Sequence, residues 1–182
     1  KEFTPDFLAR GLWLDRDAEA PLTTRWLNWA ARNRINTFRV PDTLLPEIKK
    51  RGFMLNTGRT DVFTTLLKPE YTYRYNHPQS EIDENLPTDP YLLSDQFLGD
   101  RNQDGQLSYF EAHPEWFIEN IDSSTINYPD SLPAVFCLSN PDALKEFCRL
   151  VADKLTFGEW RSCDIVDIWA PEFWCNCEKC RT

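Results

Sequence analysis

A twelve-residue segment carries the sharpest chemical pattern in the sequence. Oxygen-bearing side chains stand at its first, third, fifth, ninth and twelfth positions, and a glycine stands at its sixth. This is the spacing of an EF-hand calcium loop, in which hard oxygen ligands surround the ion and the glycine permits a sharp turn. The predicted ligands are Asp100, Asn102, Asp104, Gln106 through its backbone carbonyl, Ser108 through a water molecule, and Glu111. The alternative is an ordinary acidic Asn/Asp/Gly turn.

The residues that flank this loop predict how it would be used. Asp89 and Pro90 offer a cap and a first-turn proline, so residues 89–98 are expected to form an entering helix. Pro114 limits any exit helix, and the sequence contains no second loop to pair with the first. We therefore expect a structural calcium ion rather than a calcium sensor.

Three of the six cysteines form a C-x-C-x-x-C cluster made of Cys175, Cys177 and Cys180. One interpretation is a structural zinc site in which Cys137 or another distant cysteine is the fourth ligand. Another is two or more disulfides in an exported protein, and a third is free thiols. The remaining pair, Cys148 and Cys163, is expected to lie in the core, where free cysteines are common.

Helix-period and strand-period segments alternate along the chain, which favours an α/β fold built from parallel βα units. Strands are expected over 7–14, 35–40, 53–57 and 163–170, helices over 23–32, 42–49 and 141–157, and strand or extended chain over 133–138. About four βα units predict that 1–182 is the first half of a TIM-type (β/α)₈ barrel; a complete doubly wound sheet is the alternative. Residues 60–130 break the rhythm and are expected to form a long excursion that carries the calcium loop, 100–111.

In such a fold, residues beyond the C-terminal ends of the strands line the active site. Glu172 follows the last predicted strand among aromatic residues, whose apolar surroundings would raise its carboxyl pKa towards general-acid use. The alternative is a surface-loop glutamate. Aromatic rings and polar groups that could contact a sugar complete the candidate substrate-binding set, which consists of Asp15, Arg39, Asn56, Arg59, Asp61, His113, Trp116 and Trp174.

The overall charge argues against two classes of partner. Twenty Lys and Arg against 29 Asp and Glu give a formal net charge of −9. This balance, without any basic run, argues against nucleic acid and against anionic membrane surfaces. No apolar run approaches the roughly 20 residues that span a bilayer, so no membrane span is expected. The chain starts without Met or a signal sequence, and we expect a piece of a longer protein.

Several motifs together resemble a known family. They are the elements 113–117 (HPEWF), 137–141 (CLSNP), 174–181 (WCNCEKCR) and 29–36 (WAARNRIN). In this order they resemble the bacterial family called domain of unknown function 4838, which looks like a glycoside-hydrolase-type TIM barrel distantly similar to α-glucuronidases. That family usually carries Pro-Asn-Asp where this chain has Ala170-Pro171-Glu172. The resemblance implies a carbohydrate-active role in an exported polysaccharide-degrading system.

These observations lead to one expectation and two rivals. The expectation is a calcium-stabilised, exported bacterial glycosidase-like domain that acts on poly- or oligosaccharides, with Glu172 as general acid/base. Its partner carboxylate is then expected beyond residue 182, in the rest of the barrel, with further domains in the full-length chain. The rivals are a non-catalytic carbohydrate-binding or cell-surface module and a calcium-dependent interaction module.

Overall fold

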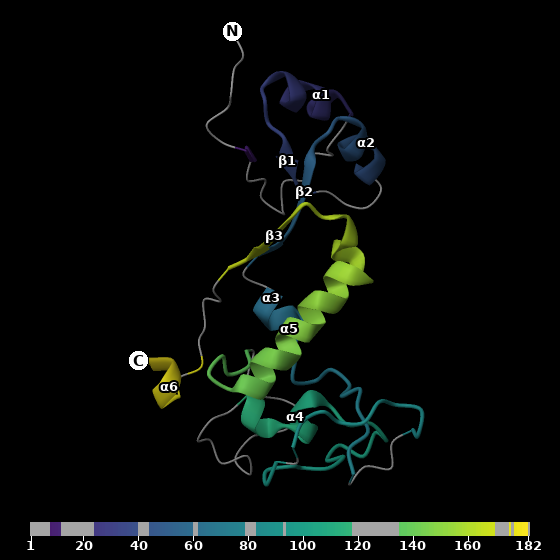
Figure 1. Ribbon diagram of the computed structural model, residues 1–182, viewed down its shortest axis with the longest axis vertical. Coiled ribbons are helices and arrows are strands. Elements are labelled where there is room, and N and C mark those ends of the chain that lie inside the picture. The colour runs from purple at the N-terminus through teal and green to yellow at the C-terminus, as the bar shows by residue number, and fades with distance from the viewer. Residues whose placement is uncertain are drawn as a thin grey trace. The chain divides into compact units, whose positions relative to one another are not determined.

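The computed structural model describes residues 8–11, 24–39, 44–59, 62–78, 83–92, 94–117, 135–169, 175 and 177–181. They belong to two compact units (Figure 1). The first unit contains residues 1–59 and 154–167, and the second contains 60–153 and 168–182.

The helices and strands alternate at first and are then interrupted by irregular chain (Figure 1). In chain order the elements are α1 (Thr24–Arg32), β1 (Thr37–Phe38), α2 (Leu45–Lys50), β2 (Met54–Arg59), α3 (Val62–Thr65), α4 (Tyr109–Ala112), the 3₁₀ helix η2 (Pro114–Trp116), α5 (Pro141–Thr156), the 3₁₀ helix η4 (Glu159–Ser162), β3 (Ile165–Ile168) and α6 (Glu178–Arg181).

The strands form one sheet in the order β1-β2-β3. The first two are parallel, with Thr37 opposite Met54 and Phe38 opposite Leu55. Strands that follow one another in the chain are therefore neighbours in the sheet, as the predicted βα units require. Of the first predicted strand, the described residues 8–11 form a single parallel bridge, between Gly11 and Thr37.

The core of the first unit explains why α1 and α2 fold where they do. Leu27 and Ala30 lie three residues apart on α1 and are fully buried, as is Ile48 on α2. They pack in one cluster with Phe38 and Phe53. Fully burying a Leu, Ile or Phe side chain contributes about 1.5–3 kcal/mol. The packing of this cluster, more than the intrinsic stability of such short helices, holds α1 and α2 on the sheet. The helices predicted over 23–32 and 42–49 are confirmed, although α2 starts at Leu45.

Helix α5 confirms the helix predicted over 141–157. Asn140 accepts hydrogen bonds at its Oδ1 from the backbone N–H groups of Asp142 and Ala143, at 3.0 and 3.1 Å. The side chain thus caps the helix directly before Pro141, a residue favoured in the first turn. The described residues of 133–138 form no strand; Cys137 instead donates its N–H to the carbonyl of Trp116, at 2.6 Å.

The entering helix predicted over 89–98 is wrong for the residues that the structure describes. Residues 89–92 and 94–98 are turns and irregular chain. Asp89 accepts the N–H of Tyr91 at 2.8 Å, and Ser94 accepts that of Gln96 at 3.0 Å. Such bonds from a short side chain to the backbone two residues on compete with a helix, and here the turns prevail.

Candidate metal centre

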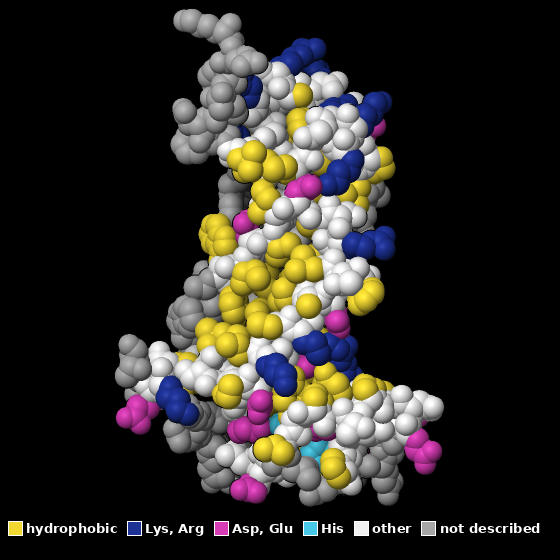
Figure 2. All heavy atoms as spheres, in the orientation of Figure 1, with side chains coloured by type: hydrophobic (Ala, Val, Ile, Leu, Met, Phe, Trp, Pro, Cys, Tyr) yellow, Lys and Arg dark blue, Asp and Glu magenta, His cyan; other side chains and the backbone are white. Residues whose placement is uncertain are grey.

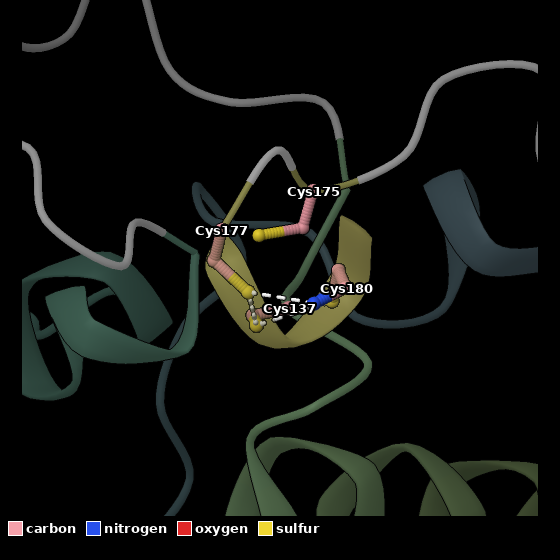
Figure 3. Close-up of side chains that lie close together, drawn as sticks. All are labelled: Cys137, Cys175, Cys177 and Cys180. Carbon is pink, nitrogen blue, oxygen red and sulfur yellow. Dashed lines mark hydrogen bonds between the residues drawn. The ribbon is translucent and has the colours of Figure 1, made fainter. Parts of the chain in front are cut away.

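Four cysteines gather in the second unit (Figure 3). The sulfur atoms of Cys137, Cys175, Cys177 and Cys180 all lie within 4.8 Å of one another. The Sγ of Cys137 is 3.7 Å from that of Cys177 and 3.9 Å from that of Cys180. A tetrahedron of sulfurs about 2.3 Å from a zinc ion has edges of about 3.8 Å, whereas a disulfide bond measures about 2.05 Å. The spacing is that of a metal site, and no disulfide joins any two of the six cysteines.

Two separate parts of the chain supply these sulfurs. Cys137 lies just before α5, where its backbone is fixed to Trp116. Of the other three, Cys175 and Cys177 precede α6 and Cys180 lies inside it, and the N–H of Cys180 donates to the Sγ of Cys177 at 3.3 Å. The C-x-C-x-x-C spacing brings three ligands together locally, but Cys137 joins them only through tertiary packing. Sequence reasoning could therefore offer Cys137 only as one candidate for the fourth position.

Ser139 lies next to this cluster, although no ligand spacing in the sequence points to it. Its Oγ is 2.9 Å from the Sγ of Cys180. Burial raises the pKa of the Cys180 thiol, but hydrogen bonds from Ser139 and from the neighbouring cysteines outweigh burial and lower the pKa to about 7. Burial, together with hydrogen bonding to Cys175, raises the pKa of Cys137. Metal ligation requires the thiolate, so Cys180 is favoured for binding and Cys137 would release its proton as the metal binds.

The other two cysteines lie outside the cluster. Cys163 is half-buried, and Cys148 is exposed, so the prediction of a core position for Cys148 is wrong. The reason is that α5 buries a different face. Its buried residues are Ala143, Glu146 and Phe147, whereas Leu144 is 39% exposed. The buried face of α5 therefore includes a charged residue, Glu146, while Cys148 lies off that face.

The predicted calcium loop is folded as a tight turn. Gly105 has a φ of +80°, a region that glycine reaches without strain. Asp100 accepts the N–H groups of Asp104 and Gly105, at 3.1 and 2.8 Å. Glu111 is 1% exposed and accepts the N–H of Arg101 at 2.8 Å. The carboxylates of Asp100 and Glu111 thus point towards the backbone of the loop itself.

The end of the predicted calcium loop pairs with a neighbouring segment, residues 71–73. The carbonyl of Leu107 accepts the N–H of Tyr73 at 2.6 Å, and the N–H of Tyr109 donates to Tyr71 at 2.9 Å. Thr72 and Ser108 form an antiparallel bridge. The exit helix α4 has only four residues, as Pro114 led us to expect. Within the described residues, however, the four cysteines are the only group whose ligand atoms already converge for a metal.

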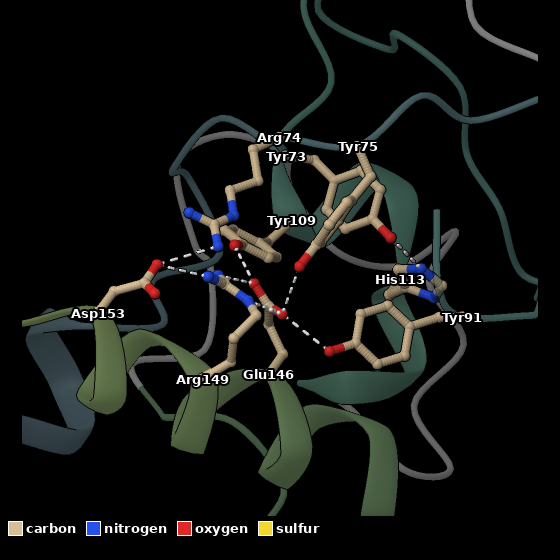
Figure 4. A network of polar contacts seen from close by, with 9 residues as sticks. All are labelled: Tyr73, Arg74, Tyr75, Tyr91, Tyr109, His113, Glu146, Arg149 and Asp153. Atoms are coloured by element: carbon tan, nitrogen blue, oxygen red, sulfur yellow. Dashed lines mark hydrogen bonds and ion pairs between the residues drawn. The ribbon is translucent and has the colours of Figure 1, made fainter. Parts of the chain in front are cut away.

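A buried carboxylate organises the core of the second unit (Figure 4). Glu146 is fully buried and accepts hydrogen bonds from the hydroxyls of Tyr75, Tyr91 and Tyr109, at 3.1, 2.8 and 2.6 Å. Arg149 forms an ion pair with it. Burial raises the pKa of Glu146, while the hydrogen bonds from the tyrosines oppose that rise. Burial likewise raises the pKa of Tyr75, to about 12. The buried carboxylate is thus fully engaged with three tyrosine hydroxyls and an arginine, an arrangement that is structural in character.

His113 and Trp116 belong to the same core, and each is 1% exposed. The Nε2 of His113 is 3.0 Å from the hydroxyl of Tyr73, and its Nδ1 is 2.8 Å from Glu115. Trp116 stacks on the His113 ring with the centroids 4.3 Å apart. Side chains buried in this way present no surface to a sugar ring. The placement therefore argues against the substrate-contact role predicted for both residues.

Two other residues of the candidate substrate-binding set are described, and both make contacts within the first unit. Arg39 donates to the carbonyl of Gly58 at 2.8 Å. Asn56 lies inside β2 rather than after it, and donates to Asp167 at 2.6 Å. The structure places Asn56 within the sheet and Arg39 directly after β1. Several predicted residues lie outside the described part of the chain: Asp15, Asp61, Glu172, Trp174 and the side chain of Arg59.

Charge is unevenly divided between the units. The second unit contains seven Lys and Arg against nineteen Asp and Glu, although the first is slightly basic. On the face shown in Figure 2, Lys and Arg gather over the region of α1 and α2. An acidic field of this kind raises the local concentration of cations around the second unit. Among the described helices, none has the length and apolar character needed to cross a membrane.

Comparison with known proteins adds no assignment. The chain has no significant match among protein-family models, curated proteins or solved structures.

Proposed function

We propose that this chain is a zinc-binding domain in which Cys137, Cys175, Cys177 and Cys180 hold one structural Zn²⁺ ion. The observation that carries this proposal is that the four sulfurs lie within 4.8 Å of one another, with Cys137 at 3.7 Å from Cys177 and 3.9 Å from Cys180. The last two distances are close to the edge of a zinc–thiolate tetrahedron, about 3.8 Å. Four protein sulfurs fill a tetrahedral site and leave no open position for water or substrate. The ion therefore stabilises the fold and does not take part in catalysis.

The stabilisation follows from what the ion would connect. It joins the segment before α5 to α6, and Cys137 and Cys177 are 40 residues apart. Treated as a cross-link that closes a loop of this length, the ion contributes about 4 kcal/mol by restricting the unfolded chain. For a unit of this size, that corresponds to a melting temperature higher by about 10 °C or more.

Thermal unfolding with and without a strong zinc chelator tests this function. We expect the zinc-loaded chain to melt at least about 10 °C above the chelated one. Cys137→Ser should abolish the difference, whereas Cys148→Ser, which changes an exposed cysteine outside the cluster, should retain it. Equal melting temperatures with and without the chelator would reject the zinc site.

We further propose that Asp100–Glu111 binds a structural calcium ion. The loop spacing, the inward carboxylates and the bridge to residues 71–73 support this. With zinc saturating, a calcium-selective chelator should lower the melting temperature, and Asp104→Ala should remove the response. Asp95→Ala, which alters an exposed aspartate outside the loop, serves as the control. A parent chain that melts alike with and without calcium would contradict the proposal.

As a second function, we propose a carbohydrate-active, glycoside-hydrolase-like role with Glu172 as general acid/base. Its support is the chain-order sheet with parallel β1 and β2, the arrangement expected for the first half of a (β/α)₈ barrel. Cys175 follows Glu172 by three residues, so the zinc site would fix that end of the segment. We expect an exported protein that cleaves oligo- or polysaccharides.

A hydrolysis screen of the full-length parent on aryl glycosides and polysaccharides tests this second function. Glu172→Gln should lower the rate at least about a hundredfold, as expected when a general acid is lost. Binding of glycans without cleavage, unchanged in Glu172→Gln, would instead support the non-catalytic carbohydrate-binding module. Calcium-dependent association with a protein would support the interaction module.

A further inference from the structure

The cysteine cluster is held unequally by its surroundings. Cys177 is 5% exposed, and its sulfur accepts the backbone N–H of Cys180. Cys180 is half-buried and lies on α6, a helix of only four residues. A ligand on so short a helix gains little rigidity from the helix itself. Its orientation must be fixed by contacts from outside α6.

Ser139 supplies such a contact. Its Oγ lies 2.9 Å from the Sγ of Cys180. Ser139 comes from the other ligand-bearing segment, two residues after Cys137 and directly before Asn140, the cap of α5. The hydroxyl is therefore carried by backbone that the start of a sixteen-residue helix holds in place.

Groups that do not touch the metal can still determine how well it is bound. A donor to a ligand atom fixes the orientation of that ligand and spreads its negative charge. Once Cys180 is a thiolate it can only accept, so the Ser139 hydroxyl donates and the sulfur accepts. The bond also ties the Cys137 segment to α6 through a residue that is not a ligand.

We propose that Ser139 is a positioning residue of the metal site, an inference that rests on the proposed zinc-binding function. The Ser139 hydroxyl donates to the Cys180 thiolate and holds it in place for Zn²⁺. The metal is bound by the four cysteines, and Ser139 sets the strength of one of those bonds. Its removal weakens zinc binding without removing a ligand.

Competition with a chromophoric chelator measures the zinc affinity of the full chain and its variants. Ser139→Ala should weaken binding about ten- to a hundredfold, the usual effect of losing an outer partner of a metal ligand. Ser139→Thr keeps the hydroxyl and should restore the parent affinity to within about threefold. Ser162→Ala, which changes an exposed serine on η4, should bind like the parent.

Cobalt in place of zinc gives a readout that general destabilisation would not produce. A hydrogen bond to sulfur stabilises its lone pairs, so the sulfur-to-cobalt charge-transfer band should move to longer wavelength in Ser139→Ala and return in Ser139→Thr. The metal-free melting temperatures of the three chains should agree.

Equal zinc affinity in the parent and Ser139→Ala would overturn this inference while leaving the zinc site intact. So would a Ser139→Thr chain as weak as Ser139→Ala. A parent chain that binds no zinc would instead overturn the proposed function itself.

Discussion

Replacing Glu146 by alanine is the most demanding test of how the second unit is held together. The substitution leaves the buried hydroxyls of Tyr75, Tyr91 and Tyr109 without their acceptor. Each orphaned buried donor costs about 1–3 kcal/mol. Part of the cost of the three orphaned donors is offset, because the charged carboxylate no longer has to be buried. Removing one partner of a buried ion pair costs about 3–5 kcal/mol in all. We expect a loss of about 4 kcal/mol.

The arginine partner adds little to that loss. Arg149 is 25% exposed and keeps a second ion pair, with Asp153 at 2.7 Å. Glu146→Gln retains one oxygen acceptor without the charge, so it should lose about half as much stability as Glu146→Ala.

Urea unfolding of the zinc-loaded chain, followed by intrinsic fluorescence, measures these differences. The control is Glu159→Ala, which removes an exposed carboxylate paired with Lys154 at 3.3 Å. Such a surface pair contributes less than about 1 kcal/mol. If Glu146→Ala lost no more stability than Glu159→Ala, the hydrogen-bonded network described above would not be the organising feature of this core.

Two further predictions concern His113 and Gly58. Burial lowers the pKa of His113, but hydrogen bonds to Asp89 and Glu115 outweigh burial and raise it above 6.5. The free energy of unfolding that protonated His113 contributes is therefore complete below about pH 6.5, the pKa in the unfolded chain. It is lost as the pH rises through the higher pKa of the folded chain. Urea titrations at a series of pH values should show this decline, and His113→Gln should flatten it. Gly58→Ala should lower the free energy of unfolding by about 3 kcal/mol or more in the same assay. Its φ is +94°, and an added Cβ would lie 2.1 Å from the carbonyl oxygen of Asp167. A loss below about 1 kcal/mol would contradict this close approach of β2 and β3.

The sequence predicted the elements whose signals are local. Helix α1 follows from the three-residue spacing of Trp26 and Trp29, and α5 follows from Asn140 and Pro141 at its start. Strand β2 and its parallel pairing with β1 follow from apolar runs separated by a short helix. The three clustered cysteines were equally visible, since their spacing alone places three ligands together.

What the sequence could not predict depends on contacts between distant residues. Glu146 lies on the buried face of α5. The hydrogen bonds from three tyrosine hydroxyls compensate for the loss of water around its carboxylate. No periodicity in α5 reveals partners up to 71 residues away. For the same reason, no sequence pattern marks Ser139, whose partner Cys180 is 41 residues away. His113 and Trp116 were predicted at a binding surface because aromatic and imidazole rings suit such a surface as well as a core.

X-ray absorption at the zinc edge, combined with the metal content of the purified chain, tests the central claim most directly. We predict one zinc per chain, surrounded by four sulfurs at about 2.3 Å, and loss of the metal in Cys177→Ser but not in Cys148→Ser. A chain without zinc whose mass under non-reducing conditions shows two disulfides would contradict the account. So would a zinc ion with three sulfurs and an oxygen or nitrogen, because Cys137 would then not be the fourth ligand.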